Sequence, residues 1–243
     1  MSKPTLHTVL SPALLNLYDV SDSIVVIIDV LRATSTIATA LYNGAASVIP
    51  VATVQRCIEL GKEVGGITAG ERDGKVAEGL TYGNSPFEYP SSFVRDRVLV
   101  LTTTNGTKLL HMALDNGASE IITGSFPNLT AVVEHLRKQN RNVILGCSAW
   151  KNRVNIEDTL FAGAVIEQLE EQFTINCDSS HIALNLYKAA KPDLFGFMKA
   201  NNATHYHRLT NFGLDRDMKY CLTADGAPTL PMFVGDRLIR VNH

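Results

Sequence analysis

The sequence predicts an α/β fold with a mostly parallel, mixed sheet, and three observations support this class. First, Ile24–Ile28 is a short, continuous run of β-branched residues, which is typical of a strand buried on both faces. Second, similar runs alternate along the chain with stretches of helical periodicity. Third, 243 residues with 45% hydrophobic content can build a substantial core. No linker or low-complexity tract interrupts the chain, so we expect one domain over residues 1–243.

The composition excludes several classes of protein. The net charge is −2 and charged residues make up 19% of the chain, so no basic field for nucleic acid is evident. The first residues lack a signal-peptide pattern, and no apolar run reaches membrane-spanning length. The four cysteines are widely spaced and form no C-x-x-C, which favours reduced thiols. We therefore expect a cytoplasmic protein with no nucleic-acid or membrane partner; a homodimer is compatible with the sequence.

The first ninety residues alternate between strand and helix signals. Ser11-Pro12 indicates an early turn, and Asn43-Gly44 and Gly65-Gly66 are typical helix stops. The expected elements are strands at 8–10, 24–28, 47–51 and 67–69, helices at 34–42 and 53–64, and a loop at 79–90.

The second part of the chain begins with what resembles a copy of the first. An ungapped offset of 73 residues places Val25 on Val98 and Asn43-Gly44-Ala45 on Asn116-Gly117-Ala118. Apolar positions match almost throughout, whereas the residues at the strand ends differ. We therefore predict an internal strand–loop–helix–strand repeat with units at about 24–51 and 97–124. Chance matching of short apolar segments is the alternative.

The remaining segments continue the same pattern. After the second unit we expect a strand at 143–145 and a helix that Glu157-Asp158 opens and that runs to 169. We further expect helices at 182–189, 194–200 and 215–222, and a closing strand at 233–241.

Carboxylates near the predicted strand ends suggest a metal site. Asp29 follows directly on the strand 24–28, and ligands of open α/β sheets bind beyond the carboxyl ends of such strands. Oxygen ligands are those that Mg²⁺ prefers. The candidate ligands are Asp29, Glu71, Asp73, Glu157 and Asp158. Plainer explanations are loop charges for Glu71 and Asp73, and a favourable helix N-terminal charge for the last two.

Two turns after predicted strands carry groups that suit an anion. Arg32, Thr34 and Ser35 follow Asp29 at a helix N-terminus, where backbone N–H groups also point outward. The second turn, Thr102–Thr107 (TTTNGT), offers four hydroxyl groups, and its Gly106 lets the backbone approach a ligand. Helix capping and an Asp29–Arg32 ion pair are the simpler explanations of these residues.

Two other function classes stay open. Cys147 lies beyond the strand 143–145 and could be a thiol nucleophile with Asp29 as its base partner, an arrangement that resembles isochorismatase-like hydrolases. A non-catalytic protein that binds small anions is the second alternative. We expect no zinc site, because the histidines are scattered and His205-x-His207 has no acidic or cysteine companion at zinc spacing.

Together, five motifs in this order resemble the 2-phosphosulfolactate phosphatase family over most of the chain. They are Ile28–Thr36 (IDVLRATST), Gly70-Glu71-Arg72, Gly83-Asn84-Ser85-Pro86, Thr102–Thr107 and Glu157-Asp158. The resemblance implies a three-layer α/β/α fold and a Mg²⁺-dependent acid phosphatase. The implied reaction converts (R)-2-phospho-3-sulfolactate to sulfolactate and phosphate in coenzyme M biosynthesis. The segment Cys147–Trp150 departs from the Cys-Ala-Gly-Thr-like turn expected of the family.

We therefore expect a phosphatase for a small, doubly anionic phospho-hydroxy acid. Asp29, Arg32 and Glu71 are the predicted catalytic residues. Mg²⁺ is held by Asp29 and Glu71, with Asp73, Glu157 or Asp158 as further ligands, while Arg32 binds the phosphoryl group. The sequence leaves open whether Asp29 attacks phosphorus itself. The expected substrate-binding residues are Thr34, Ser35, Asn84, Ser85, Thr103, Thr104, Asn105, Gly106 and Thr107.

Overall fold

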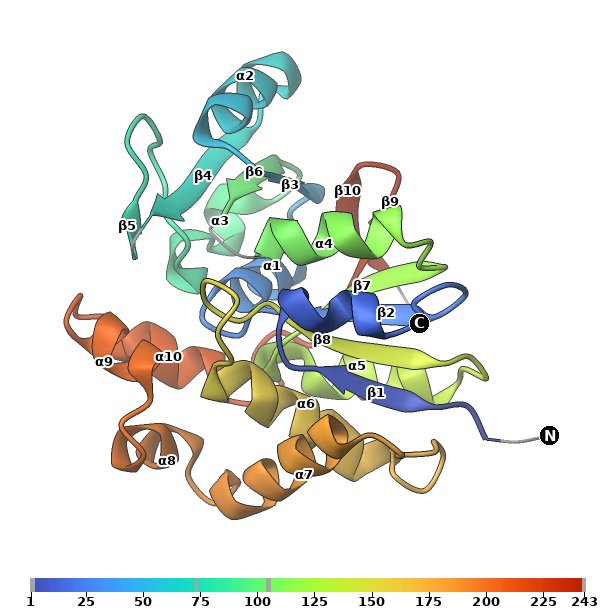
Figure 1. The fold of residues 1–243 in the computed structure, drawn as a ribbon. Helices are drawn as coiled ribbons and strands as arrows, with labels where there is room; N and C mark the ends of the chain where they lie inside the picture. Colours follow the sequence, from blue (N-terminus) through green and yellow to red (C-terminus); the bar gives the residue numbers. More distant parts are fainter. Residues whose placement is uncertain (1–2, 73, 104–105, 242–243) are drawn as a thin grey trace.

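The protein, for which we have a computed structural model, forms a mixed sheet. The structure describes residues 3–72, 74–103 and 106–241. Within these residues ten strands pair in the order β1-β8-β2-β7-β9-β10-β3-β6-β4-β5, and helices connect most of them (Figure 1). The predicted α/β class is confirmed. The three-layer arrangement and the internal repeat stay predictions.

The elements have the following bounds. The strands are β1 (Leu6–Val9), β2 (Ile24–Ile28), β3 (Ser47–Val51), β4 (Ile67–Arg72), β5 (Lys75–Val76), β6 (Val98–Thr102), β7 (Glu120–Gly124), β8 (Val143–Cys147), β9 (Leu230–Val234) and β10 (Arg237–Val241). The α-helices are α1 (Ala33–Tyr42), α2 (Val54–Val64), α3 (Ser91–Val94), α4 (Gly106–Asp115), α5 (Leu129–Arg137), α6 (Ile156–Leu169), α7 (Asp178–Ala190), α8 (Leu194–Ala200), α9 (Thr204–Thr210) and α10 (Asp215–Cys221). The 3₁₀ helices are η1 (Pro12–Leu17), η2 (Pro86–Glu88) and η3 (Phe126–Asn128).

Most expected elements occur near their predicted bounds. Helices α3, α5 and α9, the two-residue strand β5 and the 3₁₀ helices were not expected. The expected single closing strand at 233–241 is wrong, because the chain forms a hairpin of β9 and β10. Gly235, with a φ of 66°, and Asp236 form its two-residue turn. The Gly-Asp pair is a hairpin signal that the sequence does contain.

Strand β2 is buried on both faces, as its sequence predicts. Val25 and Ile27 pack in one hydrophobic cluster with Leu109 of α4, whereas Val26 and Ile28 pack in another with helices such as α6. Because successive side chains of a strand point to opposite faces, both clusters hold β2 in place. Its carboxyl end, where Asp29 follows, is thereby fixed in the middle of the sheet.

The two parallel parts of the sheet are joined by the C-terminal hairpin. Strands β1, β8, β2 and β7 are parallel, and so are β3, β6 and β4. The three pairings between these groups, β7–β9, β9–β10 and β10–β3, are all antiparallel. The strands of the two groups therefore run in opposite directions where the hairpin joins them. A sheet twists by roughly 20–25° between neighbouring strands, and over the six steps from β2 to β4 this twist turns the carboxyl ends of these two strands toward each other.

Helix α1 is buried on all sides between the elements around it. All its residues from Ala33 to Leu41 are buried, including four with hydroxyl groups. These hydroxyls have partners: Ser35 Oγ donates to the Val30 carbonyl (2.8 Å), and Thr36 Oγ1 donates to that of Asn84 (3.0 Å). A buried helix needs such pairing because unsatisfied polar groups are costly. Its hydroxyls therefore fix the loops at its start.

The two predicted repeat units contain the same elements in the same order. Helices α1 and α4 coincide at the 73-residue offset at both of their ends, and β3 and β7 do so as well. Common origin of the two units stays a prediction.

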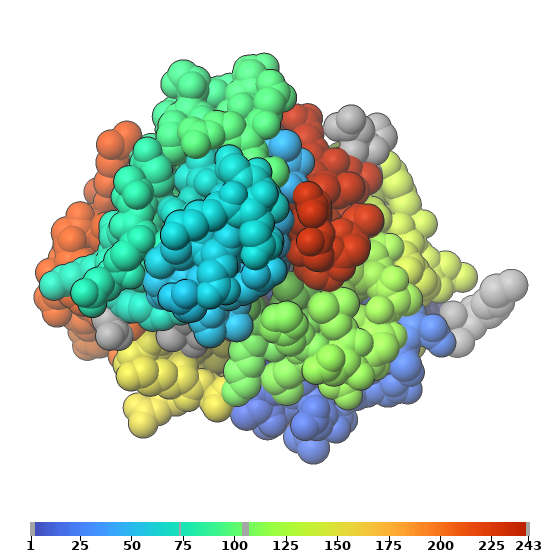
Figure 2. All heavy atoms as spheres, turned by 90° about the horizontal axis from the view of Figure 1, so that it is seen from above, coloured from blue at the N-terminus to red at the C-terminus, as the bar shows by residue number. Residues whose placement is uncertain are grey.

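Helices from the last third of the chain lie at the edge where β4 ends. Figure 1 shows α9 and α10 on the same side of the molecule as β5. Phe212, which follows α9, lies against Gly74 in the turn between β4 and β5. Seen from above in Figure 2, the C-terminal hairpin (red) reaches the surface of the molecule. In the described part of the chain, no helix has the length and apolar character needed to span a membrane.

Candidate active site

A small cavity lies where β2 and β4 end, and helix α9 covers it. Its polar lining comes from segments far apart in the sequence: Asp29, Arg32, Glu71, Asn84, Thr103, His205 and Arg208. We call it the Asp29 cavity. It brings together the three predicted catalytic residues Asp29, Arg32 and Glu71, which lie up to 42 residues apart in sequence.

Asp29 lies at the bottom of this cavity in an unfavourable electrostatic position. Its side chain is buried, and burial raises the pKa of the carboxyl to about 6. The nearby His205 opposes this rise of the pKa, whereas the charges of Glu71 and Glu157 add to it. The carboxylates of Glu71 and Glu157 therefore both act on Asp29, and a cation beside Asp29 would relieve this repulsion.

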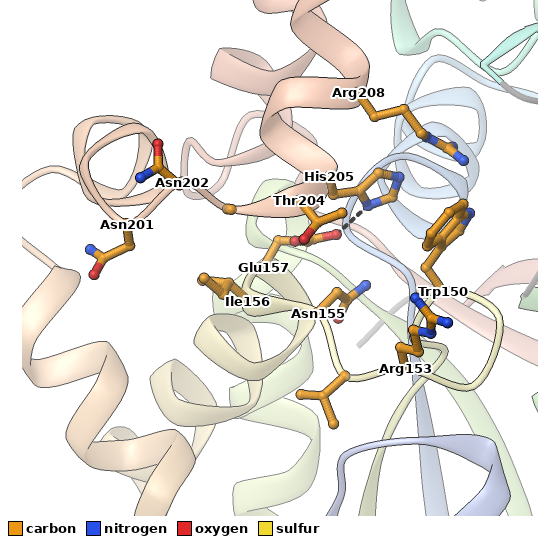
Figure 3. A pocket seen from close by; sticks show the side chains of 12 residues that line it. Trp150, Arg153, Asn155, Ile156, Glu157, Asn201, Asn202, Thr204, His205 and Arg208 are labelled. Carbon is orange, nitrogen blue, oxygen red and sulfur yellow. Dashed lines mark hydrogen bonds and ion pairs between the residues drawn. The ribbon is translucent and has the colours of Figure 1, made fainter.

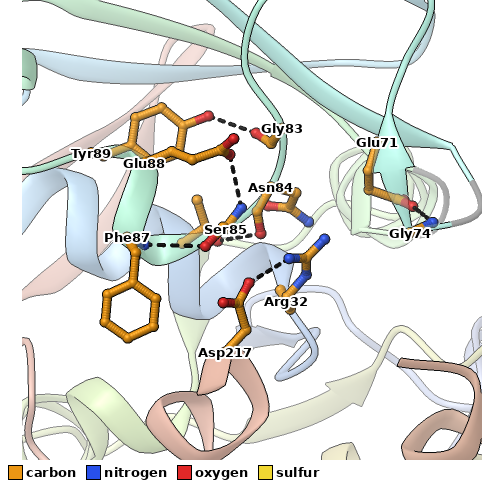
Figure 4. A network of polar contacts seen from close by, with 11 residues as sticks. Arg32, Glu71, Gly74, Gly83, Asn84, Ser85, Phe87, Glu88, Tyr89 and Asp217 are labelled. Carbon is orange, nitrogen blue, oxygen red and sulfur yellow. Dashed lines mark hydrogen bonds and ion pairs between the residues drawn. The ribbon is translucent and has the colours of Figure 1, made fainter. Parts of the chain in front are cut away.

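Glu71 is held in a fixed orientation by the turn that follows it. The backbone N–H of Gly74 donates to Glu71 Oε2 at 2.9 Å (Figure 4). Gly74 has a φ of 79°, and a Cβ at this position would lie 2.7 Å from the Phe212 ring. Only glycine fits this turn, so the turn sequence determines where the Glu71 carboxylate points.

Arg32 is buried and pairs with Asp217 rather than with Asp29. Its Nη1 donates to Asp217 Oδ2 at 2.5 Å, and both side chains are less than 10% exposed. Figure 4 shows the two side chains facing each other beside the loop of Gly83–Ser85. Asp217 belongs to α10, and no sequence motif marks it. The ion pair aligns the guanidinium at the wall of the cavity, where its other N–H groups can meet an anion.

Asn84 and Thr103 are the two predicted substrate-binding residues that line the Asp29 cavity. Asn84 is buried, and its Oδ1 has no hydrogen-bond partner within the described chain. Because buried polar atoms are normally paired, this oxygen is available to a ligand.

His205 is a site residue that sequence reasoning missed. Its Nδ1 makes a short hydrogen bond with Glu157 Oε1, while its Nε2 is buried and has no partner in the described ranges. Glu157 opens α6 and His205 lies in α9, so neither is near the other in sequence. The sequence search expected an acidic companion close to the histidine, whereas the fold supplies one from another helix.

Asp158 has a different position from its neighbour Glu157. Its Oδ1 accepts from the Val30 N–H (2.9 Å), and its Oδ2 accepts from Ala149 N–H and Asn155 Nδ2. The three donors occupy both oxygens, and Asp158 does not line the Asp29 cavity. It therefore ties together the loops after β2 and β8, and we do not include it among the proposed metal ligands.

The other predicted substrate-binding residues lie elsewhere. Thr34 Oγ1 accepts from the Asp29 backbone N–H, and Ser85 Oγ accepts from Phe87 N–H, so both hydroxyls stabilise turns, as that of Ser35 does. Thr107 lines a separate, largely apolar cavity together with residues such as Leu110. Gly106 begins α4. The predictions for Asp73, Thr104 and Asn105 fall outside the described residues.

The donors in the Asp29 cavity suit Mg²⁺ with few protein ligands. Within residues 3–72, 74–103 and 106–241, no three side chains of His, Cys, Asp or Glu form a ready-made metal site. Two carboxylates, Asp29 and Glu71, and the amide oxygen of Asn84 line the same cavity. Mg²⁺ usually keeps several waters and binds through one or two carboxylates plus substrate phosphate, so this donor set fits it.

Cys147 does not have the properties of a nucleophile. It is fully buried in the hydrophobic cluster around β8. Burial raises its thiol pKa well above the ordinary value, and the charges of Asp158 and Glu157 raise it further. Because the thiolate is the reactive form, this thiol is inert.

We therefore expect Cys147→Ala to keep phosphatase activity within about threefold of the original protein, at a stability cost of about 1–2 kcal/mol for the small cavity. Phosphate release and thermal unfolding of the variant check this. A complete loss of activity in a folded Cys147→Ala protein would favour the thiol-hydrolase alternative.

Comparison with known proteins identifies the family of the chain. A model of the 2-phosphosulpholactate phosphatase family matches residues 9–236. A protein from Thermotoga maritima, named probable 2-phosphosulfolactate phosphatase, is 39% identical over 209 residues, which cover 86% of this chain and 88% of the relative. Relatives with the same name are 38% identical in Caldanaerobacter subterraneus (88% of each chain) and 34% identical in Clostridium acetobutylicum (90% and 93%). The chain therefore belongs to the 2-phosphosulfolactate phosphatase family.

Proposed function

We propose that this protein is a Mg²⁺-dependent phosphatase that hydrolyses (R)-2-phospho-3-sulfolactate to sulfolactate and phosphate, in the cytoplasm and in the synthesis of coenzyme M. The observation that carries the proposal is the meeting of Asp29, Glu71 and Arg32 in one cavity. Two acidic groups beside a guanidinium suit a phosphate dianion that is bound together with a divalent cation. Membership of the family supports the phosphatase reaction.

Asp29, Glu71 and Asn84 would hold the metal ion. When bound, Mg²⁺ would polarise the phosphoryl oxygens and neutralise charge in the transition state. The family implies this ion, and the unpartnered Asn84 Oδ1 and the crowded carboxylates are consistent with it.

Arg32 would bind the phosphoryl group. Asp217 fixes one side of its guanidinium, so the remaining N–H donors need no reorientation when charge develops on the phosphoryl oxygens. Such preorganised donors usually contribute a large part of catalysis, because no solvent has to reorganise during the reaction.

His205 would protonate the leaving oxygen. In the simplest reaction, the oxygen of a water molecule bonds to phosphorus while the bond between phosphorus and the substrate's C2 oxygen breaks. That oxygen keeps the electron pair and takes a proton from His205 Nε2, and a proton from the attacking water later restores His205. Glu157 holds His205 Nδ1, which leaves Nε2 directed to the cavity.

Phosphate release tests the function directly. We expect the protein to release phosphate from 2-phosphosulfolactate with Mg²⁺ present and to lose more than about 90% of this activity in excess EDTA, with recovery when Mg²⁺ is restored. A full rate in EDTA would exclude the metal-dependent reaction. If the substrate raises the thermal stability but no phosphate is released, the protein is an anion-binding module instead.

A further inference from the structure

A second and larger cavity adjoins the Asp29 cavity. It has a volume of about 320 Å³, and it is lined by residues of the loop before α6, including Trp150 and Arg153, and by residues of α9. We call it the Trp150 cavity (Figure 3). His205 and Arg208 line both cavities. A substrate whose phosphoryl group lies beside Arg32 can therefore extend past Arg208 into the Trp150 cavity.

Polar atoms around the Trp150 cavity lack partners. Four buried atoms of its lining residues have no hydrogen bond within the described chain: Asn155 Oδ1, Glu157 Oε2, His205 Nε2 and Arg208 Nε. Buried polar atoms are rarely left unpaired, because they lose their hydration without compensation. Of these atoms, Arg208 Nε is a donor that suits an anion, whereas Asn155 Oδ1 and Glu157 Oε2 are acceptors that water can satisfy. The unpaired donor of Arg208 therefore marks the part of the cavity that can receive an anionic group.

The charges of the Trp150 cavity favour an anion. The guanidinium carbon of Arg208 lies 5.1 Å from the centre of the Trp150 ring, and this cation–π contact restricts its position. None of the ion pairs found in the described ranges involves Arg208 or Arg153. The one carboxylate in the lining, Glu157, is engaged by His205. The lining therefore holds two arginines against one carboxylate, which already pairs with His205 through its Oε1.

We infer that the Trp150 cavity binds the sulfonate-bearing end of the substrate, with Arg208 as the residue that selects for it. This inference rests on the proposed function. A guanidinium matches the oxygens of a sulfonate as it matches those of a phosphate, with two parallel N–H donors. Arg153 at the exposed rim adds positive charge that attracts the doubly anionic substrate.

This assignment differs from the expectation that the Thr103–Thr107 turn receives the second anionic group; Thr104 and Asn105 of that turn lie outside the described residues. Thr107 faces an apolar cavity with Leu110 and Leu238, where a sulfonate would lose its hydration. Arg208 is the second arginine, beside Arg32, that lines the Asp29 cavity, and it lines the Trp150 cavity as well.

Arg208→Gln tests the inference through substrate preference. The readout is the ratio of kcat/KM for 2-phosphosulfolactate to kcat/KM for ethyl phosphate, which has no second anionic group. We expect the variant to lower this ratio about 10–100-fold, mainly through KM, because a hydrogen bond to a charged group is lost. Arg208→Lys keeps the charge without the planar fork and should lower the ratio less.

Arg97→Gln is the matched control, because Arg97 also stacks on an aromatic ring, that of Phe93 at 4.8 Å, but lies away from both cavities. Its ratio should equal that of the original protein. An unchanged ratio in Arg208→Gln, or an equal loss on both substrates, would overturn the inference.

Calorimetric titration with sulfolactate separates this inference from the proposed function. If Arg208→Gln weakens the binding of sulfolactate at least tenfold, the result supports the sulfonate site. This holds even if the original protein releases no phosphate from either substrate. Equal binding by the original protein and the variant, or no binding by the original protein, contradicts it.

Discussion

Asp29→Asn is expected to abolish catalysis and at the same time to stabilise the metal-free protein. Asparagine keeps the shape of the side chain and an acceptor oxygen, but it removes the negative charge that we propose binds Mg²⁺. We expect phosphate release to fall by more than about 10²-fold. The gain in stability follows from the electrostatics of the site, because the negative charge of Asp29 is buried beside those of Glu71 and Glu157.

The sign of the stability effect depends on pH. Folding raises the pKa of the Asp29 carboxyl from 3.8 to about 6, so the native state binds this proton more tightly than the unfolded chain does. The free energy of unfolding therefore decreases as the pH rises between these two values, by up to about 3 kcal/mol, and stays lower above them. Asparagine avoids this loss, so the advantage of the variant should appear at pH 8 and shrink toward pH 4.

Thermal unfolding in EDTA at several pH values measures this gain in stability. For a chain of this size, each kcal/mol shifts Tm by about 2–4 °C. Mg²⁺ should then stabilise the original protein more than the variant. Glu134→Gln, which removes an exposed carboxylate of α5, serves as the control and should change neither property. A variant that keeps full activity, or one that is less stable than the original protein at pH 8 in EDTA, contradicts the assignment of Asp29.

Arg32→Met is expected to damage both the fold and the activity, and a second substitution can separate the two effects. Arg32 and Asp217 form a buried ion pair, so removing the guanidinium leaves an uncompensated carboxylate. Such losses typically cost about 3–5 kcal/mol. Activity should also disappear, because the phosphoryl group loses its preorganised donor.

The double variant Arg32→Met with Asp217→Asn removes both charges. The double variant should regain most of the stability that Arg32→Met alone loses, since neutral replacements of a buried ion pair are often tolerated. Phosphate release should not recover. The exposed Arg56–Glu63 pair gives a comparison, because Arg56→Met should cost less than about 1 kcal/mol. Recovery of both stability and activity in the double variant would show that Arg32 acts only through the fold.

The parts of the fold that local sequence determines were predictable. A β-branched run such as Ile24–Ile28 and a stop signal such as Asn43-Gly44 define elements through short-range physics, and these elements occur where expected. The direction of the two halves of the sheet was not predictable, since it depends on pairings such as Leu238 with Val48, 190 residues apart.

The candidate site likewise contains some residues that local sequence predicts and others that only the fold reveals. Asp29, Glu71 and Asn84 follow or lie near recognisable strands and turns, so the sequence suggested them and they line one cavity. Asp217 and His205 lie in short helices without a motif, and their importance comes from partners in other elements, Arg32 and Glu157. The hydroxyls of Thr34 and Ser35 have partners at the start of α1, and the sequence could not distinguish this role from anion binding, because helix caps and anion sites use the same residues.

The hairpin that joins the two halves of the sheet has a consequence for how the protein is made. During synthesis, strands β1 to β8 leave the ribosome before β9 and β10 exist. At that stage the hairpin cannot yet join the two halves of the sheet. His205, Arg208 and Asp217 also come late in translation. The nascent chain therefore carries Asp29, Arg32 and Glu71 before it carries His205, Arg208 and Asp217, and the candidate site can close only after α10 has been made.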